Sequence, residues 1–288
     1  MRQIVQLLSF FAALLFITYN SSGQPVLSVK LNKEVRDNYI IRTDFNRYFD
    51  QCGVRGSVVI YDHSKQQWIV SDTIALNTRN LPASTFKIIN LLIFLETKTI
   101  ADENAIVKWP GATDTVKYGY RPDIYHDISI KSAFELSAGW AFIELAKKIN
   151  RNVYRDYLVR CGYGNADVSF KEADFWNFGG LGISPVEQVK LLKNLYDEKL
   201  PFSKRNMDIV KKVMISEQNA DGIIRSKTGW TMAGGINTGW WVGYVETKGE
   251  AYFFATQLLQ DRKKNRPDFS RCRKDITRAV LKDLEILH

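Results

Sequence analysis

The sequence predicts an α+β fold: an antiparallel sheet from strands near both ends of the chain, with flanking helices, packed against a mainly helical middle. Two observations carry this prediction. Strand-like runs around short polar turns lie at 56–72 and again at 222–259, whereas helical patterns dominate from about 82 to about 217. Because hairpins build antiparallel sheets, we expect both groups of strands in one sheet beside the helices.

The individual elements follow from local patterns. They are, in order, a hairpin at 56–72, helical segments at 84–98, 130–150 and 184–198, strands at 222–230, 239–246 and 251–259, and a helix at 273–287. Ser184 and Glu187 have the spacing of a capping box at the start of the third helical segment. The turn 247–250 joins the last two strands, and the glycine-rich run 232–239 is predicted as a loop.

The N-terminus has the pattern of a signal peptide. A basic tip at Arg2, an apolar stretch and small residues up to Gly23 predict cleavage after Gly23, with an uncleaved membrane anchor as the alternative. Residues 24–288 are then expected to form one exported, periplasmic domain, with a helical subdomain at about 80–217, no membrane span, and a monomeric or homodimeric state.

The distribution of basic residues and the spacing of the cysteines argue against nucleic-acid binding and against a metal site. Cleavage of the signal peptide removes one arginine, so the formal net charge falls from +9 to 39 − 31 = +8. The basic residues are spread along the chain, which favours a solvated surface and no nucleic-acid partner. Cys52, Cys161 and Cys272 are far apart, so we expect no metal site and at most one disulfide, with the pairing open.

Ser84 and Lys87 are the first candidates for chemistry. They stand three residues apart after Pro82, so both would lie on one face of the first turn of a helix. Free backbone N–H groups there can hold an oxyanion, and a buried, neutral lysine can serve as the base that activates the serine. Alone, the pair is more typical of a capping serine and a surface-reaching lysine.

A second candidate is Lys227-Thr228-Gly229, on the strand predicted at 222–230. It presents a cation, a hydroxyl and a glycine that would let a substrate approach the backbone. Alone, this pattern is also typical of an ordinary strand surface.

Together these motifs resemble the class D (OXA-type) serine β-lactamases, within the penicillin-binding-protein-like transpeptidase superfamily. The segments that carry the resemblance, in the family's order and spacing, are PASTFKI, YGN at 163–165, DFW ending at Trp176, KTGW, GWWVGYVE and CRKDITRAVLKD. The resemblance covers nearly the whole mature chain. It implies hydrolysis of the β-lactam ring of penicillin-type antibiotics, antibiotic resistance, and no cofactor beyond CO2 bound to a lysine as a carbamate.

Residue by residue, the resemblance implies Ser84 as the nucleophile and Lys87, carboxylated by CO2, as the general base. It implies Ser137 as a proton relay and the backbone N–H groups of Ser84 and Trp230 as the oxyanion hole. The residues implied in catalysis or in contact with the substrate carboxylate side are Lys227, Thr228, Gly229, Trp230 and Arg273. Trp176 and Phe142 would surround the carbamate.

Two departures from the family pattern are expected to change the surroundings of Lys87. Gly139 stands where the family's Ser-x-Val motif has valine, and Asn177 stands where an apolar residue is common. Both changes make the environment of Lys87 wetter, which favours its ammonium form and puts deacylation in doubt. The alternatives are therefore a β-lactam-acylated binder that does not turn over, similar to the family's sensor relatives, and a D,D-peptidase.

Overall fold

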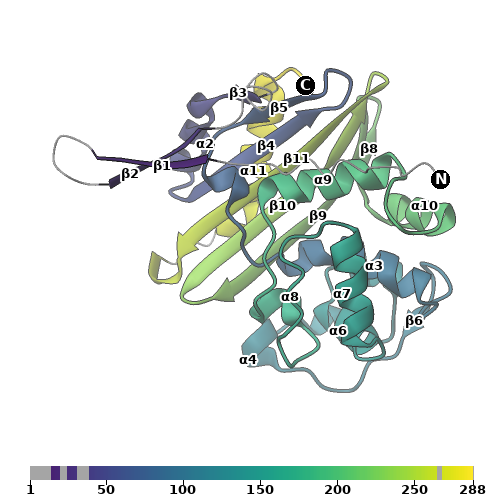
Figure 1. The fold of residues 1–288 in the computed structure, drawn as a ribbon. Helices are drawn as coiled ribbons and strands as arrows, with labels where there is room; N and C mark the ends of the chain where they lie inside the picture. The colour runs from purple at the N-terminus through teal and green to yellow at the C-terminus, as the bar shows by residue number, and fades with distance from the viewer. Residues whose placement is uncertain (1–13, 20–24, 31–38, 265–267, 288) are drawn as a thin grey trace, which may run out of the picture. The chain divides into compact units, whose positions relative to one another are not determined.

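The computed structural model describes residues 14–19, 25–30, 39–264 and 268–287 (Figure 1). The chain divides into two units, residues 1–39 and 40–288. In the first unit, β1 (Leu14–Tyr19) and β2 (Pro25–Lys30) pair antiparallel, with Leu14 opposite Lys30. The rest of the predicted signal peptide, including the cleavage point at Gly23, lies outside the described residues, so cleavage stays a prediction.

The second unit is built on a seven-stranded sheet that joins both ends of the domain. Its order is β3-β5-β4-β11-β10-β9-β8. The strands are β3 (Tyr39–Ile41), β4 (Arg55–Asp62), β5 (Gln67–Val70), β8 (Ile215–Asn219), β9 (Gly222–Ala233), β10 (Ile236–Thr247) and β11 (Glu250–Asp261). In the centre, β4 pairs antiparallel with β11, and Ile60 lies opposite Phe254. The prediction of one sheet from N- and C-terminal strands is confirmed.

Two tight turns set the register of the long C-terminal strands. Lys248 and Gly249 have φ angles of 52° and 81° and close the predicted turn between β10 and β11. The prediction of a loop at 232–239 is wrong, because β9 and β10 stay paired up to Ala233 and Ile236. Gly234 and Gly235, at φ 57° and 76°, make a two-residue turn of the kind that matches strand twist.

Helices cover both faces of the sheet and fill the middle of the chain (Figure 1). They are α2 (Asn46–Gln51), α3 (Lys87–Glu96), α4 (Thr115–Tyr118), α5 (Ile130–Glu135), α6 (Gly139–Ala146), α7 (Arg151–Arg160), α8 (Phe175–Phe178), α9 (Pro185–Tyr196), α10 (Lys204–Val213) and α11 (Phe269–Asp283). Two short strands, β6 (Ile106–Val107) and β7 (Ile128–Ser129), pair with each other.

The alternation of side chains along the strands separates the two faces. Trp241 and Phe254 point into the core shared with α2 and α11. Phe253, next to Phe254, and its cross-strand partner Tyr244 point the other way, where each ring lies 5.5 Å from that of Tyr196 in α9. The capping box predicted at the start of α9 is present.

The helical segment predicted at 130–150 is interrupted. Helix α5 ends at Glu135 and α6 begins at Gly139, so Ser137 lies in the turn between them and not within a helix. Its φ angle is 59°, in the left-handed region that non-glycine residues rarely adopt. Apolar residues follow the helical period on both sides of this turn, which is why the sequence pattern hides it.

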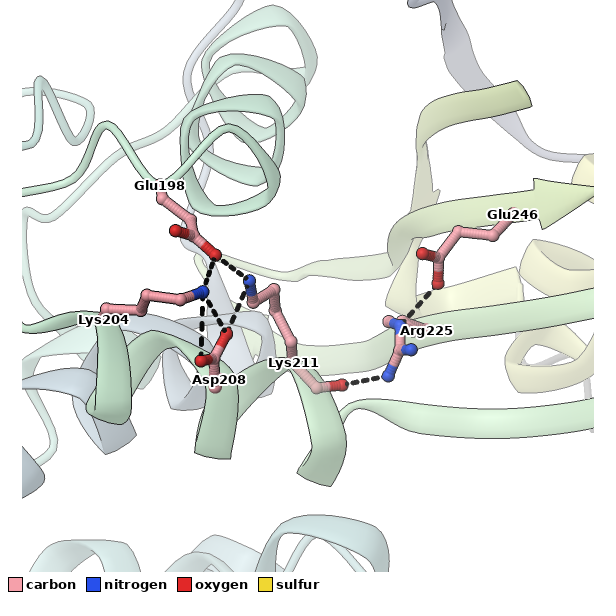
Figure 2. A network of polar contacts seen from close by, with 6 residues as sticks. All are labelled: Glu198, Lys204, Asp208, Lys211, Arg225 and Glu246. Carbon is pink, nitrogen blue, oxygen red and sulfur yellow. Dashed lines mark hydrogen bonds and ion pairs between the residues drawn. The ribbon is translucent and has the colours of Figure 1, made fainter. Parts of the chain in front are cut away.

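A polar network fastens α10 to the sheet (Figure 2). Lys211 of α10 pairs with Glu198 and Asp208. Arg225 of β9 donates to the backbone oxygen of Lys211 at 2.7 Å and pairs with Glu246 of β10 at 2.6 Å. The guanidinium thus satisfies a carbonyl left without a partner at the end of α10. This contact ties α10 to β9 two residues before Lys227.

The cysteine pairing that the sequence leaves open is defined by the structure. Cys52, at the end of α2, forms a disulfide with Cys272 of α11 across 220 residues, and Cys161 is buried and free. This bridge holds together the two elements that cover one face of the sheet. Within the described ranges, none of the helices combines the length and apolar character needed to cross a membrane.

Candidate active site

The candidate nucleophile lies in a 3-10 turn before α3, not in the first turn of an α-helix as the sequence predicts. Ser84 belongs to the turn Ala83–Phe86, which Thr85 anchors. The Thr85 hydroxyl donates to the Pro82 oxygen at 2.7 Å and accepts from Gln188 of α9 at 2.7 Å. Ala83 has a φ of 51°, a strained conformation of the kind found at functional sites.

Lys87 is the first residue of α3, and its amine faces Ser84. The Nζ atom donates to Ser84 Oγ at 2.8 Å, although the residue is only 1% exposed. Burial lowers the pKa of Lys87 from its usual 10.5 to about 7. The ring of Phe142 from α6 lies 5.1 Å from Nζ and forms an apolar wall. The neutral form of the amine is therefore accessible near pH 7, as a base for Ser84 requires.

A second lysine–serine pair completes the polar centre. Lys227 of β9 donates to Ser137 Oγ and to the Thr228 backbone oxygen, both at 3.0 Å. Burial, with repulsion from Lys87 and Arg273, holds the pKa of Lys227 well below its usual value. Each lysine thus contacts one serine hydroxyl, and both amines give up a proton easily.

Gly229 lets the strand and the serine turn meet. A Cβ atom there would lie 2.9 Å from the Pro82 oxygen and 3.1 Å from a methyl carbon of Thr85. The sequence predicts this glycine as a place where substrate approaches the backbone. In the structure, the close approach is made by the turn that bears Ser84.

A cleft of about 430 Å³ lies at this centre, and Lys227, Trp176 and Phe142 are not among its lining residues. Of the predicted site residues, those that line it are Ser84, Lys87, Ser137, Thr228, Gly229, Trp230 and Arg273. Arg273 of α11 donates to the Gly229 oxygen at 2.7 Å, and burial lowers its pKa to about 10. Trp230 is 47% exposed at the cleft.

Trp176 of α8 lies in the wall next to the serine turn. Its ring stacks on Phe86 at 5.2 Å with an interplanar angle of 17°. The indole is 1% exposed, and its Nε1 has no hydrogen-bond partner among the described residues. A buried N–H without an acceptor is costly, so an oxygen acceptor placed beside it would be stabilising.

Sequence reasoning assigned no role to several residues of the cleft. The opposite wall is formed by α4 and the chain after it, with Val116, Lys117, Tyr118, Gly119 and Arg121. Asp174, directly before α8, holds this wall from behind through the Tyr118 hydroxyl, and nothing in the sequence pattern assigns it that role. Its side chain makes no capping bond.

Gly139 and Asn177, the two departures from the family pattern, both line the cleft. A Cβ atom on Gly139 would meet nothing within 4 Å, so the cleft is open beside this glycine. The backbone oxygen of Asn177 accepts from Thr231 of β9 at 2.7 Å. Among the residues that the structure describes, no three His, Cys, Asp or Glu side chains gather in a way that could hold a metal ion.

Comparisons with known proteins agree with this fold and cleft. Residues 56–282 match the family model of the penicillin binding protein transpeptidase domain. β-Lactamase OXA-48 of Klebsiella pneumoniae is 34% identical, and the match covers 94% of this chain and 96% of that protein. β-Lactamase OXA-2 of Salmonella typhimurium is 33% identical, and the match covers 91% of this chain and 92% of that protein. A class D β-lactamase structure from Sebaldella termitidis superposes with a TM-score of 0.82 at 37% identity, covering 87% of this chain and 99% of that one. The chain therefore belongs to the class D β-lactamase family, within the penicillin-binding transpeptidase superfamily.

Proposed function

We propose that the protein hydrolyses the ring of penicillin-type β-lactams through an acyl-enzyme on Ser84, and so confers resistance to them. The observation that carries this proposal is the 2.8 Å contact between Lys87 Nζ and Ser84 Oγ. An amine with a pKa of about 7, buried against a serine hydroxyl, is a base matched to neutral pH.

Acylation follows from the two lysine–serine pairs. Lys87 takes the proton of Ser84, through a carbamate oxygen once its amine has reacted with CO2, while Oγ forms a bond to the lactam carbonyl carbon. The ring C–N bond breaks, and the Ser137 hydroxyl gives its proton to the leaving nitrogen. Lys227, which donates to Ser137 at 3.0 Å, restores that proton. Its depressed pKa makes this transfer easy.

The other cleft residues would hold the substrate. Arg273 and Thr228 both line the cleft, and a guanidinium can bind a carboxylate through two parallel hydrogen bonds. The backbone N–H groups of Ser84 and Trp230 would stabilise the negative charge that develops on the carbonyl oxygen. Gly229 keeps strand and turn close enough for both groups to act on one atom.

Lys87 is suited to carry a carbamate. Its neutral amine and CO2 form an N-carboxylate with release of one proton, and the buried N–H of Trp176, which has no partner, would donate to a carbamate oxygen. Phe142 would shield the group from water. When formed, the carbamate supplies an anionic oxygen base both for Ser84 and for the water that removes the acyl group.

The hydrolase proposal is tested by mixing purified protein with a chromogenic cephalosporin, with and without added bicarbonate. Turnover that bicarbonate increases is expected, and Ser84→Ala should abolish it. Absence of turnover in both conditions would contradict hydrolysis.

A long-lived acyl-enzyme is the second candidate, favoured by the open space at Gly139 and the polar Asn177 in the cleft. Mass spectrometry separates the two functions. A Ser84 adduct that persists for hours identifies a binder, whereas rapid return to the free mass identifies a hydrolase.

We infer that the protein acts in the periplasm after removal of residues 1–23. The Cys52–Cys272 disulfide supports export, because such bonds persist in oxidising compartments. Cell fractionation with sequencing of the mature N-terminus tests this inference. Recovery of a chain that still begins at Met1 would contradict it.

A further inference from the structure

One wall of the catalytic cleft is a helix too short to be stable by itself. Helix α4 has four residues, and three of them, Val116, Lys117 and Tyr118, line the cleft. A single helical turn fixes many dihedral angles for very few hydrogen bonds, so its position depends on contacts with other elements. Asp114 caps the turn locally by accepting from the N–H groups of Val116 and Lys117. This cap shapes the turn without attaching it to the rest of the molecule.

The attachment is made by Asp174. The Tyr118 hydroxyl donates to Asp174 Oδ2 at 2.5 Å, and Lys117 Nζ lies 3.3 Å from the same oxygen. The Asp174 side chain is 2% exposed, so water screens these contacts little. Glu172 also pairs with Lys117 at 2.5 Å, but its side chain is 62% exposed. Of these two carboxylates, the buried one is expected to carry most of the energy.

Asp174 acts from behind the wall. It does not line the catalytic cleft but a second cavity of about 640 Å³, and Tyr118 lines both. Asp174 also accepts from the N–H of Asn177 through its backbone oxygen at 2.8 Å, directly beside Trp176. Phe178 of the same short helix packs under Lys117, 4.4 Å from its Nζ. The wall and the segment that carries Trp176 are thus joined at one buried carboxylate.

We propose that Asp174 is a positioning residue that holds α4 against α8 and so sets the width of the cleft that α4 lines together with Trp230. This inference rests on the proposed function, since it assigns the cleft to the β-lactam. Loss of the carboxylate would free α4, and the substrate would then have to order the wall on binding. The cost falls on KM, because Ser84, Lys87 and Lys227 make no contact with Asp174 that would change the chemical step.

The test uses the full protein with Asp174→Ala, Tyr118→Phe, the double variant and Glu172→Gln as the matched control. We expect KM for a penicillin to rise about tenfold in Asp174→Ala, with kcat changed less than twofold, as loss of a hydrogen bond to a charged group implies. Tyr118→Phe should reproduce much of this rise, and the double variant should add little to Asp174→Ala. Glu172→Gln should raise KM less than twofold. Asp174→Asn, which keeps the volume, replaces Asp174→Ala if the latter does not fold.

Hydrogen exchange gives a readout that does not depend on turnover. Amides at 115–119 should exchange faster in Asp174→Ala, while those of α3 keep their wild-type rates. An unchanged rate at 115–119, a uniform increase along the chain, or an equal KM rise in Glu172→Gln would each overturn the inference. If the wild type fails to hydrolyse β-lactams, the proposed function falls, and the exchange rates still decide whether Asp174 holds α4.

Discussion

The Nζ atom of Lys87 lies 2.8 Å from the Oγ atom of Ser84, at the start of a helix whose residues Lys87–Leu95 are all buried. The sequence places an ammonium group in an apolar run, and the structure gives this placement a chemical meaning. Burial makes the charged form costly, so the amine is partly neutral near pH 7 and available to accept a proton.

The rate of Ser84 acylation should therefore depend on pH around 7. With a pKa of about 7, the neutral fraction of Lys87 rises about tenfold between pH 6 and pH 8, and the acylation rate should rise with it. Quenched-flow mass spectrometry at constant dissolved CO2 measures this rate. A rate that is flat from pH 6 to 8 would contradict the assignment of the base.

The same pKa shift affects folding stability. The pKa of Lys87 is lower in the folded than in the unfolded protein, so Lys87 adds stability as pH rises from about 7 to 10.5.

Replacing Trp176 with phenylalanine removes the buried N–H that has no partner and keeps a ring on Phe86. If this N–H holds a carbamate, the bicarbonate concentration for half-maximal carboxylation should rise about tenfold, the effect of losing a hydrogen bond to an anion. The 13C carbamate resonance measures it, and Lys87→Ala, which should show no resonance, is the control. Equal bicarbonate dependence in wild type and Trp176→Phe would remove the tryptophan from this role.

Replacing Gly139 with valine should speed deacylation. A Cβ atom there has open space, so the variant is expected to fold. Its methyl groups would exclude water beside Lys87 and favour the neutral amine that reacts with CO2. The lifetime of the Ser84 adduct should shorten several-fold, whereas Gly139→Ala, with one carbon added, should fall between valine and wild type. A longer lifetime in the valine variant would show that the open space assists water entry.

Reduction of the Cys52–Cys272 bond should destabilise the domain. The bond closes a loop of 220 residues, and loss of such a bond typically costs about 2–5 kcal/mol. Urea unfolding with a reductant should therefore show a lower midpoint for wild type and for Cys161→Ala. The Cys52→Ser variant should have the lower midpoint with or without reductant. Because Arg273 follows Cys272, KM for carboxylate substrates should also rise in the Cys52→Ser variant. An unfolding midpoint of the wild type that does not change with reductant would argue against the bond.

Much of the sheet could be predicted from the sequence because its signals are local. The turn at Lys248–Gly249 and the capping box of Ser184 and Glu187 each lie within four residues. That strands from both ends share one sheet was also expected from the antiparallel hairpins, and the structure joins them by pairing β4 with β11.

The features that were missed depend on distant contacts or on the backbone. The left-handed turn at Ser137 lies between two segments of helical period, so the pattern continues across it. Gly234 and Gly235 read as a loop, although paired strands extend to either side. The role of Asp174 depends on Tyr118, 56 residues earlier, and no local pattern relates the two.

The close packing at Gly229 means that the residues around the nucleophile and the residues that determine substrate range are expected to tolerate mutation differently. Strand β9 and the Ser84 turn meet with no room for a side chain, so changes at this contact are selected against whatever antibiotic is present. The wall formed by α4 is attached through side chains, and Val116 is 97% exposed. Mutations selected by new drugs are therefore expected to accumulate at 113–121, while the serine turn stays the same.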